Sequence, residues 1–527
     1  MPLLYFTMML IPWLCYLYYV LPYYLQMLQQ NTYNKDWAYL KWLKKNAFKN
    51  TWEFKISQLF LFILGLFLIE NSVLFASLAL MGTYVVLAYL FRRKLKQQNT
   101  REPLVYTARI KRLIGSTVMS YCLSIGLASQ YFNSFFILIL LAYFPHLLIL
   151  VVKLVNAPIE KAIYLKFKWQ AINKLKALPY LKTIGITGSY GKTSSKNILS
   201  EILSLRFNTL PTPKNYNTPN GLLITINNFL NKFHECFIAE MGARNTGEIK
   251  ELCDLVKPTY GILTIIGTAH LESFGNQANI QKTKFELIES LPAHGIALLN
   301  ADDELQTTYK LKTKAQVKWF SIKNKNADFL AKDIKTTSEG VSFKLFLKRE
   351  QKSYEFTTKL LGAANVYNIL AACALAYELG MTISELQKAV KRLTPTEHRL
   401  ELKNMGDFML IDDSYSNNPL TAKLSLDVLK SMPGKKIIIT SGMIELGSLQ
   451  TKANEEYGEA IASVCDEVIL IGNEQTKEIQ NGLRHKHYDE KHIYIIEDIK
   501  LAFNLISELK TKETYVLLKN DLTDIYQ

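Results

Sequence analysis

The sequence predicts a multi-domain protein, with an N-terminal α-helical transmembrane domain followed by two α/β domains. Long runs without charged side chains predict the helical part. After Leu181, short apolar segments alternate with helical stretches, which is typical of doubly wound parallel sheets. The expected parts are a transmembrane domain over 1–155, a basic juxtamembrane linker over 156–180, a central domain over 181–396 and a C-terminal domain over 397–527.

The N-terminal region contains four runs without Asp, Glu, Lys or Arg. These runs are residues 1–34, 56–69, 71–91 and 113–152. Because a helix that crosses a membrane needs about 20 apolar residues, the first run predicts one span. The two runs beside Glu70 predict two spans, and the last run predicts two spans that turn near Asn133. We therefore expect about five spans.

The positive charge of the chain lies beside these apolar runs. The formal net charge is +16, and segments 35–55, 92–112 and 153–182 carry +4, +7 and +6, whereas residues 183–527 are neutral overall. A protein that binds nucleic acid carries its charge as a patch on the folded domain, so nucleic acid is not an expected partner. Basic segments that flank spans face the cytoplasm. We therefore expect a multi-pass protein of the cytoplasmic (inner) membrane, with the lipid bilayer as a partner and residues 183–527 in the cytoplasm.

The remainder of the chain predicts two sets of strands and helices. In the central domain we expect strands at 183–187, 235–240, 259–266 and 295–300, a small antiparallel addition within 315–358, and a helix at 364–379. In the C-terminal domain we expect strands at 408–412, 435–440, 467–472, 492–496 and 514–518, with helices between them. Each set has the size of an ordinary domain.

The first strand of the central domain leads into a glycine loop that is typical of phosphate binding. Residues 188–194 read Gly-Ser-Tyr-Gly-Lys-Thr-Ser. Full Walker spacing would place a glycine where this chain has Ile186, so the motif is the shorter G-x-x-G-K-T-S. Backbone N–H groups of such a loop bind phosphate oxygens, the lysine contributes a point charge, and the threonine hydroxyl can bind Mg²⁺. We therefore expect a P-loop ATPase-like central domain with a site at Gly188, Ser189, Gly191, Lys192, Thr193 and Ser194.

Two further residues lie at the ends of predicted strands, on the sheet edge that carries this loop. Glu240 closes the strand at 235–240, where a carboxylate can hold Mg²⁺ directly or through water. His270 follows the strand at 259–266, and its position favours a metal or phosphate ligand over a structural histidine. Lys284, at the start of a predicted helix, is by itself an ordinary solvated lysine.

The order of these segments resembles the Mur ligases, a family of ATP-dependent enzymes that form amide bonds in peptidoglycan synthesis. The resemblance covers residues 181 to about 520. It rests on G-S-Y-G-K-T-S (188–194), N-Y-N-T-P-N-G (215–221), A-E-M-G-A-R-N-T-G-E-I (239–249), the His270 segment, K-F-E (284–286), N-V-Y-N (365–368), E-H-R-L (397–400) and D-D-S-Y-S-N-N-P (412–419). The last segment, followed by M-I-E-L-G (443–447), is most similar to the member that adds D-alanyl-D-alanine.

The resemblance implies a role for each matching residue and a Rossmann-like C-terminal domain. The catalytic residues it implies are Lys192, His270, Lys284 and Arg399. It implies ATP contacts from the 188–194 loop and from Asn365, Asn368, Arg399 and Asp413. The implied Mg²⁺ ligands are Thr193, Glu240, His270 and Lys284, the last as a carbamate, and the implied substrate contacts are Asn217 and Thr218.

The activity implied by the resemblance is the addition of D-alanyl-D-alanine to UDP-MurNAc-tripeptide through an acyl phosphate, with ATP and Mg²⁺. The implied partners are D-alanyl-D-alanine and a UDP-MurNAc-peptide or lipid-linked muramyl acceptor. Two alternatives stay open: a membrane Mur-like ligase that acts on a lipid-linked peptidoglycan precursor or on poly-γ-glutamate, and a non-catalytic scaffold. Two departures from the family bear on the substrate. Predicted spans stand in place of the UDP-binding domain, and Lys519-Asn-Asp-Leu replaces K-G-S-R.

Overall fold

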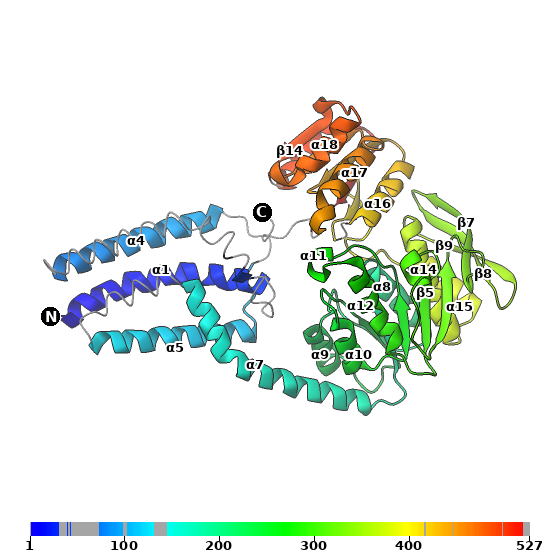
Figure 1. The fold of residues 1–527 in the computed structure, drawn as a ribbon. Coiled ribbons are helices and arrows are strands. Elements are labelled where there is room, and N and C mark those ends of the chain that lie inside the picture. The colour runs from blue at the N-terminus through cyan, green and yellow to red at the C-terminus, as the bar shows by residue number, and fades with distance from the viewer. Residues whose placement is uncertain are drawn as a thin grey trace. The chain divides into compact units, whose positions relative to one another are not determined.

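A computed structural model gives the fold of the chain (Figure 1). It describes residues 2–30, 39, 40, 43, 73–97, 103–130, 145–415, 418–444, 446–497 and 499–519. The chain divides into two compact units, which are described separately here. The first unit comprises Met1–Leu165 together with Leu522–Gln527, and the second comprises Lys166–Asp521.

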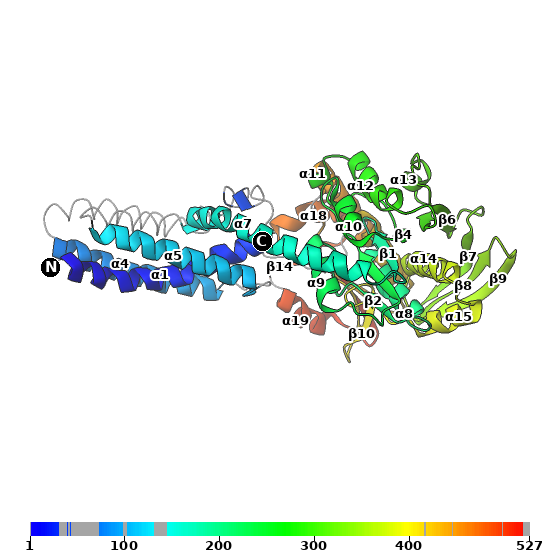
Figure 2. The same cartoon turned by 90° about the horizontal axis from the view of Figure 1, so that it is seen from below.

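The described part of the first unit is helical. Its helices are α1 (Pro2–Gln30), α4 (Val73–Gln97), α5 (Ala108–Gln130) and the first part of α7 (Pro145–Lys176), which continues into the second unit. Helices α1, α4 and α5 lie side by side in both views (Figures 1 and 2). Aromatic rings pack between them, with Trp13 edge-on to Tyr121 at 5.1 Å and Tyr16 at 5.8 Å from Tyr84. A bidentate ion pair joins Arg112 to Glu160, at 2.6 and 2.9 Å.

The predicted transmembrane domain is wrong. Across the described residues, no helix is both long and apolar enough to cross a membrane. One reason is that three of the described helices extend beyond the charge-free runs into charged sequence. Helix α4 ends in a basic stretch that includes Arg92, α5 starts with another that includes Arg109, and α7 passes through Glu160 into lysine-rich sequence. Tyrosines and two prolines, Pro12 and Pro22, lower the mean hydropathy of α1.

Other expectations depended on those spans. The finding overturns the predicted location as a multi-pass protein of the cytoplasmic membrane, and it leaves the lipid bilayer unsupported as a partner. The spans expected at 56–69 and around Asn133 lie outside the described residues.

The α/β part of the predicted fold class is confirmed. The first sheet of the second unit has the order β2-β3-β1-β4-β5-β6-β7-β8-β9. Its strands β2 to β7 pair in parallel, whereas β7, β8 and β9 pair antiparallel at one edge. The strands are β1 (Lys182–Thr187), β2 (Thr209–Pro211), β3 (Cys236–Glu240), β4 (Tyr260–Leu263), β5 (Ile296–Asn300), β6 (Gln316–Ser321), β7 (Phe329–Thr337), β8 (Gly340–Leu347) and β9 (Lys352–Thr358). Strand β6, expected in the antiparallel addition, continues the parallel sheet because it pairs with β5.

Some of the helices around this sheet begin at residues whose side chains accept backbone N–H groups. Thr218 caps α9, Asn276 caps α12, and Thr382 forms a capping box with Glu385 at the start of α15. The helices are α8 (Lys192–Leu203), α9 (Pro219–Asn228), α10 (Glu248–Val256), α11 (Leu271–Phe274), α12 (Gln277–Glu289), α13 (Glu304–Thr307), α14 (Ala363–Glu378) and α15 (Ile383–Arg392). Helix α8 packs on β1, and α14 belongs to the same apolar cluster, which includes Leu199, Ile184 and Ile369.

The second sheet has the order β10-β11-β15-β12-β13-β14, and all its neighbours are parallel except β10 and β11. Its strands are β10 (Glu401–Asn404), β11 (Met409–Asp413), β12 (Lys435–Thr440), β13 (Glu467–Ile471), β14 (Ile493–Ile496) and β15 (Thr514–Lys519). Its helices are α16 (Pro419–Ser431), α17 (Gln450–Ala462), α18 (Lys477–His485) and α19 (Ile499–Leu509), with short 3₁₀ turns η2 (Gly447–Leu449), η3 (Glu474–Thr476) and η4 (Glu490–His492). Two apolar clusters, one on each face, bury the sheet between these helices.

Candidate functional site

The loop at residues 188–191 joins β1 to α8 at the position where β1 separates β3 from β4. Ligands of open α/β sheets bind at such positions, outside the carboxyl ends of the strands. Gly188 (φ 152°) and Gly191 (φ 79°) have backbone conformations that favour glycine. A Cβ atom at Gly188 would overlap the Thr264 hydroxyl, and one at Gly191 would lie 2.8 Å from Oδ1 of Asn368. The loop therefore has the tight backbone of a phosphate cradle at the N-terminus of a helix.

Lys192 is the first residue of α8, and its side chain donates to the carbonyls of this loop. Its Nζ is 2.8 Å from the carbonyl oxygen of Gly188 and 3.1 Å from that of Ser189. Burial lowers the pKa of Lys192, the charge of Glu240 raises it, and the charge of Arg399 lowers it further. A lysine held at the mouth of a glycine loop is suited to binding phosphate oxygens.

Glu240, at the end of β3, is almost completely buried and has partners on both carboxylate oxygens. Oε1 accepts from the Thr193 hydroxyl at 3.2 Å and from the Asn217 amide at 3.0 Å. Oε2 accepts from Nζ of Lys196 at 3.1 Å. Burial lowers the pKa of Lys196, while the charge of Glu240 raises it. The group of a carboxylate, a hydroxyl and an amide offers the hard oxygen ligands that Mg²⁺ prefers.

His270 and Lys284 come from the next part of the sheet edge. His270 precedes the short helix α11 with a left-handed backbone (φ 59°), and its side chain lines the same pocket as the glycine loop. Lys284 is buried within α12, and its Nζ lies 5.8 Å from the centre of the Phe274 ring. Burial, and then the charge of Lys192, lower the pKa of Lys284 to about 7. Lys284 is therefore far from an ordinary solvated lysine.

Asn365 and Asn368 lie on the first turns of α14 and are joined to each other. The Asn368 amide donates to Oδ1 of Asn365 at 3.4 Å, and Oδ1 of Asn368 accepts from Ser195 of α8 at 2.9 Å. Asn365 donates to the carbonyl oxygen of Leu361 at 2.9 Å. These bonds fix both amides beside the glycine loop.

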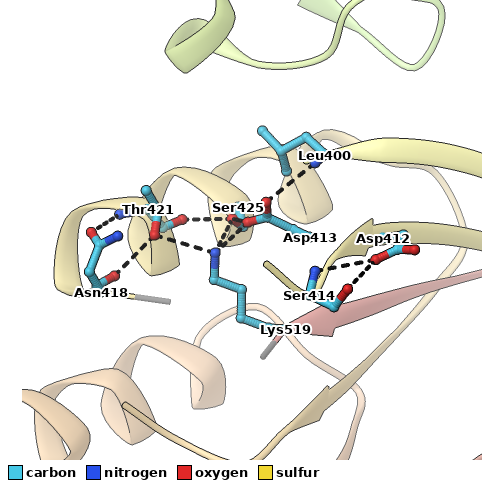
Figure 3. Close-up of polar contacts among 8 residues, drawn as sticks. All are labelled: Leu400, Asp412, Asp413, Ser414, Asn418, Thr421, Ser425 and Lys519. Atoms are coloured by element: carbon cyan, nitrogen blue, oxygen red, sulfur yellow. Dashed lines mark hydrogen bonds and ion pairs between the residues drawn. The ribbon is translucent and has the colours of Figure 1, made fainter. Parts of the chain in front are cut away.

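Asp413, at the end of β11, is part of a buried polar cluster (Figure 3). Its Oδ2 accepts from Ser425 at 2.6 Å and forms an ion pair with Lys519 of β15, which is fully buried. Its Oδ1 accepts from the backbone N–H of Leu400 at 3.3 Å. Lys519 also donates to Ser425 at 3.1 Å and to Thr421 at 3.4 Å. The cluster joins β11, β15 and α16 at the carboxyl ends of the two strands.

Arg399 lies between two residues with left-handed backbone, His398 (φ 59°) and Leu400 (φ 48°). The carboxylates at the end of β11 hold both of them, because Asp413 accepts from Leu400 and Oδ2 of Asp412 lies 2.7 Å from Nδ1 of His398. Burial lowers the pKa of the Arg399 guanidinium, while the charges of Asp413 and Glu240 raise it. Backbone strain maintained by buried carboxylates is typical of functional sites.

The structure brings most of the expected site residues to one pocket of about 800 Å³, a size usual for a ligand site. Gly188, Thr218 and Lys284 do not line this pocket. Gly188 contributes backbone beneath it, and the Thr218 hydroxyl caps α9 by accepting from Gly221 at 3.3 Å. The expected residues that line it are Ser189, Gly191, Lys192, Thr193, Ser194, Asn217, Glu240, His270, Asn365, Asn368, Arg399 and Asp413.

Sequence reasoning missed several residues that hold this site together. Lys196 lies one helical turn after Lys192, a spacing that places both on one face of α8 and could have indicated its role. Ser425 gave no signal, and the segment that begins at Lys519 was noted only as a departure that bears on the substrate. Only the tertiary fold brings β15 and α16 to Asp413. Asp302 also lines the pocket, and it accepts from Tyr367 of α14 at 3.1 Å.

The fold and the pocket are those of a nucleotide-dependent α/β enzyme, and comparison with known families places the chain among them. Residues 186–376 match the Mur ligase middle domain, and residues 398–520 match the Mur ligase, glutamate ligase domain. The chain belongs to the Mur ligase family. The predicted class of enzyme, an ATP-dependent ligase, is confirmed.

Three curated relatives share the name UDP-N-acetylmuramoyl-tripeptide–D-alanyl-D-alanine ligase. The protein of Escherichia coli is 32% identical over 56% of this chain and 65% of its own length. That of Haemophilus influenzae is 31% identical over 59% of this chain and 68% of its own length, and that of Bacillus subtilis is 29% identical over the same shares. The chain thus spans about two thirds of these relatives, and the predicted resemblance to the D-alanyl-D-alanine-adding member is confirmed.

Solved structures agree with this assignment. A crystal structure of MurF from Acinetobacter baumannii has 26% identity and a TM-score of 0.61, over 68% of this chain and 78% of that one. The MurF ligase of Thermotoga maritima, solved in complex with ADP, has 24% identity and a TM-score of 0.59, over 69% of this chain and 82% of that one. The second comparison supports the fold alone.

Proposed function

We propose that this chain is an ATP-dependent ligase that joins D-alanyl-D-alanine to UDP-MurNAc-tripeptide. The observation that carries the proposal is the pocket where Lys192, Glu240 and Arg399 converge, in a chain whose relatives carry the name of that activity. Residues 181–396 act as the ATP-binding domain, and residues 397–527 act as the C-terminal domain that contributes Arg399.

ATP is a substrate, and the roles proposed for its binding follow from the geometry of the pocket. The loop of Gly188, Ser189 and Gly191 receives phosphate oxygens, together with Lys192 and the N-terminus of α8. The fixed amides of Asn365 and Asn368 lie where they can bind the base. The Arg399 guanidinium, supplied from beside the second sheet, neutralises phosphate charge.

The residues also fit a magnesium ion. Thr193, Glu240 and His270 are the residues that would hold it, because the first two supply hard oxygen ligands and the third lines the same pocket. A bound Mg²⁺ would withdraw charge from the phosphate oxygens during transfer. Lys284 would contribute as a carbamate, and its buried amine with a pKa of about 7 is neutral often enough at physiological pH to react with CO₂.

The reaction proposed has two steps. The carboxylate of the muramyl tripeptide attacks the γ-phosphorus of ATP, and ADP leaves, giving an acyl phosphate. The amine of D-alanyl-D-alanine then attacks the acyl carbon, loses a proton, and displaces inorganic phosphate. The protein contributes positioning and charge neutralisation through Lys192 and Arg399, and Asn217 holds the acceptor near Glu240.

Incubation of the full chain with ATP, Mg²⁺, UDP-MurNAc-tripeptide and D-alanyl-D-alanine tests the proposal. Mass spectrometry is expected to show the muramyl pentapeptide, with one phosphate released for each product formed. The Lys192→Ala variant changes the first residue of α8 and not the apolar core, so it is expected to fold and to lose turnover. Phosphate release without pentapeptide, or product only with a glutamate chain as acceptor, would assign the chain to another substrate. No turnover with any acceptor would support the scaffold.

A further inference from the structure

The proposed function gives no role to Lys196, a buried charged residue beside the site. Lys196 of α8 has a side chain that is 1% exposed, and so has its partner Glu240. Lys196 does not line the pocket, whereas Glu240 does. It therefore lies behind Glu240, at a position from which it touches no ligand in the pocket and acts only through its partners.

The contacts of Lys196 restrict the two oxygens of Glu240 to different tasks. Oε2 is occupied by Lys196, at 3.1 Å. Oε1 is the oxygen that faces Thr193 and Asn217, at 3.2 and 3.0 Å. The ammonium group at Oε2 repels a second cation, so Oε1 is the oxygen left for a metal ion and Glu240 is set up as a monodentate ligand.

Lys196 also fixes the segment that carries Asn217. Its Nζ donates to the carbonyl oxygen of Lys214, a residue with left-handed backbone (φ 45°). Three residues further along the chain, the backbone carbonyl oxygen of Asn217 accepts a hydrogen bond from the backbone N–H of Gly242 at 2.8 Å. One lysine thus holds Glu240 and the neighbouring loop in a single arrangement.

The charges have a further consequence. The ammonium of Lys196 and the carboxylate of Glu240 sum to zero, so the pair offers little net attraction to a divalent cation. Phosphate oxygens bound at the adjacent loop would bring the negative charge that is otherwise absent. We infer that Lys196 is a positioning residue that keeps Glu240 monodentate and neutralised, so that a divalent cation binds this site together with nucleotide phosphates and not before them. This rests on the proposed function only in taking Thr193 and Glu240 as cation ligands.

Titration of the full chain with Mn²⁺, followed by the electron paramagnetic resonance signal of the free ion, tests the inference without either amide substrate. The wild type is expected to bind Mn²⁺ weakly alone and tightly with a non-hydrolysable ATP analogue. Lys196→Met is expected to tighten nucleotide-free binding by about 10-fold or more, because one unit charge a few ångströms away is removed. It is also expected to lower kcat with little change in the KM for ATP.

Matched variants separate this role from a purely structural one. Lys435→Met removes one of the partners of another almost fully buried carboxylate outside the pocket, Glu467, which lies 2.8 Å from Lys435 and 2.9 Å from His492. It is expected to lower thermal stability and leave Mn²⁺ binding unchanged. The double variant Lys196→Met with Glu240→Gln is expected to lose the gained affinity. If Lys196→Met does not fold, Lys196→Gln replaces it in these measurements, because glutamine keeps a hydrogen-bond donor and removes the charge.

Two results would overturn the inference. One is tight nucleotide-free binding of Mn²⁺ by the wild type, which can be measured whatever the variants do. The other is unchanged nucleotide-free affinity in a folded Lys196 variant. A chain that fails to ligate D-alanyl-D-alanine would contradict the proposed function and would leave these binding results as they stand.

Discussion

At the scale of single residues, the burial and the pKa of Lys284 differ strongly from those of an ordinary surface lysine. It is buried in α12, and its pKa is about 7. We expect Lys284→Ala to lower kcat by about 100-fold or more, the usual loss when one group that stabilises charge is removed. Short carboxylic acids such as acetate are expected to restore part of the rate, since they supply oxygens where the carbamate would stand. Full activity of the variant in a phosphate-release assay would show that Lys284 has no part in the reaction.

Gly188, at the start of the glycine loop, gives a second prediction at this scale. In Gly188→Ala, a Cβ would overlap the Thr264 hydroxyl and lie 3.1 Å from the carbonyl oxygen of Ile265. We expect this variant to lose nucleotide binding in calorimetry and to lose about 1–3 kcal/mol of stability. Gly406→Ala is the matched control, because Gly406 also has a positive φ, 90°, but no atom within 4 Å of the added Cβ. Equal nucleotide affinity in the two variants would contradict the proposed loop function.

At the scale of elements, α17 fixes the backbone of Met443, which follows strand β12. Asn454, on α17, accepts from the backbone N–H of Met443 at 2.7 Å and donates to its carbonyl oxygen at 3.0 Å. Its side chain is almost fully buried. These bonds satisfy both backbone polar groups of Met443, a residue that is itself buried.

We expect Asn454→Ala to lower the free energy of unfolding by about 2–4 kcal/mol, because two buried backbone groups lose their partner. Chemical denaturation followed by circular dichroism measures this change. Asn404→Ala, which removes an exposed bond to the N–H of Gly406, is expected to cost less than about 1 kcal/mol. Similar losses in both variants would mean that burial of the Asn454 bonds is unimportant.

At the scale of the whole molecule, the division into two compact units gives a prediction about unfolding. Because each unit has its own apolar core, we expect two thermal transitions in calorimetry. A non-hydrolysable ATP analogue with Mg²⁺ is expected to stabilise only the unit Lys166–Asp521. At 100 times its Kd, it is expected to raise the free energy of unfolding of that unit by about 2.7 kcal/mol. Lys192→Ala is expected to abolish this rise. A nucleotide effect on the other transition would contradict the assignment of the site to the second unit.

The sequence by itself determined the α/β architecture of residues 182–519 and the family. Short apolar strands with helices between them specify parallel sheets locally, and segments such as 188–194 and 412–419 are specific over a few residues. Hence the strands expected at 183–187 and 435–440 differ from β1 and β12 by at most one residue.

The tertiary structure alone decided how charged residues are used. The sequence does not show that Lys196 and Lys519 are buried, because only long-range packing places them against Glu240 and Asp413 at 1% and 0% exposure. The same limit explains the wrong transmembrane prediction. Charge-free runs show only where charged side chains are missing, whereas a span also requires one helix that is long and apolar enough. Helix boundaries depend on packing between segments, which composition does not record.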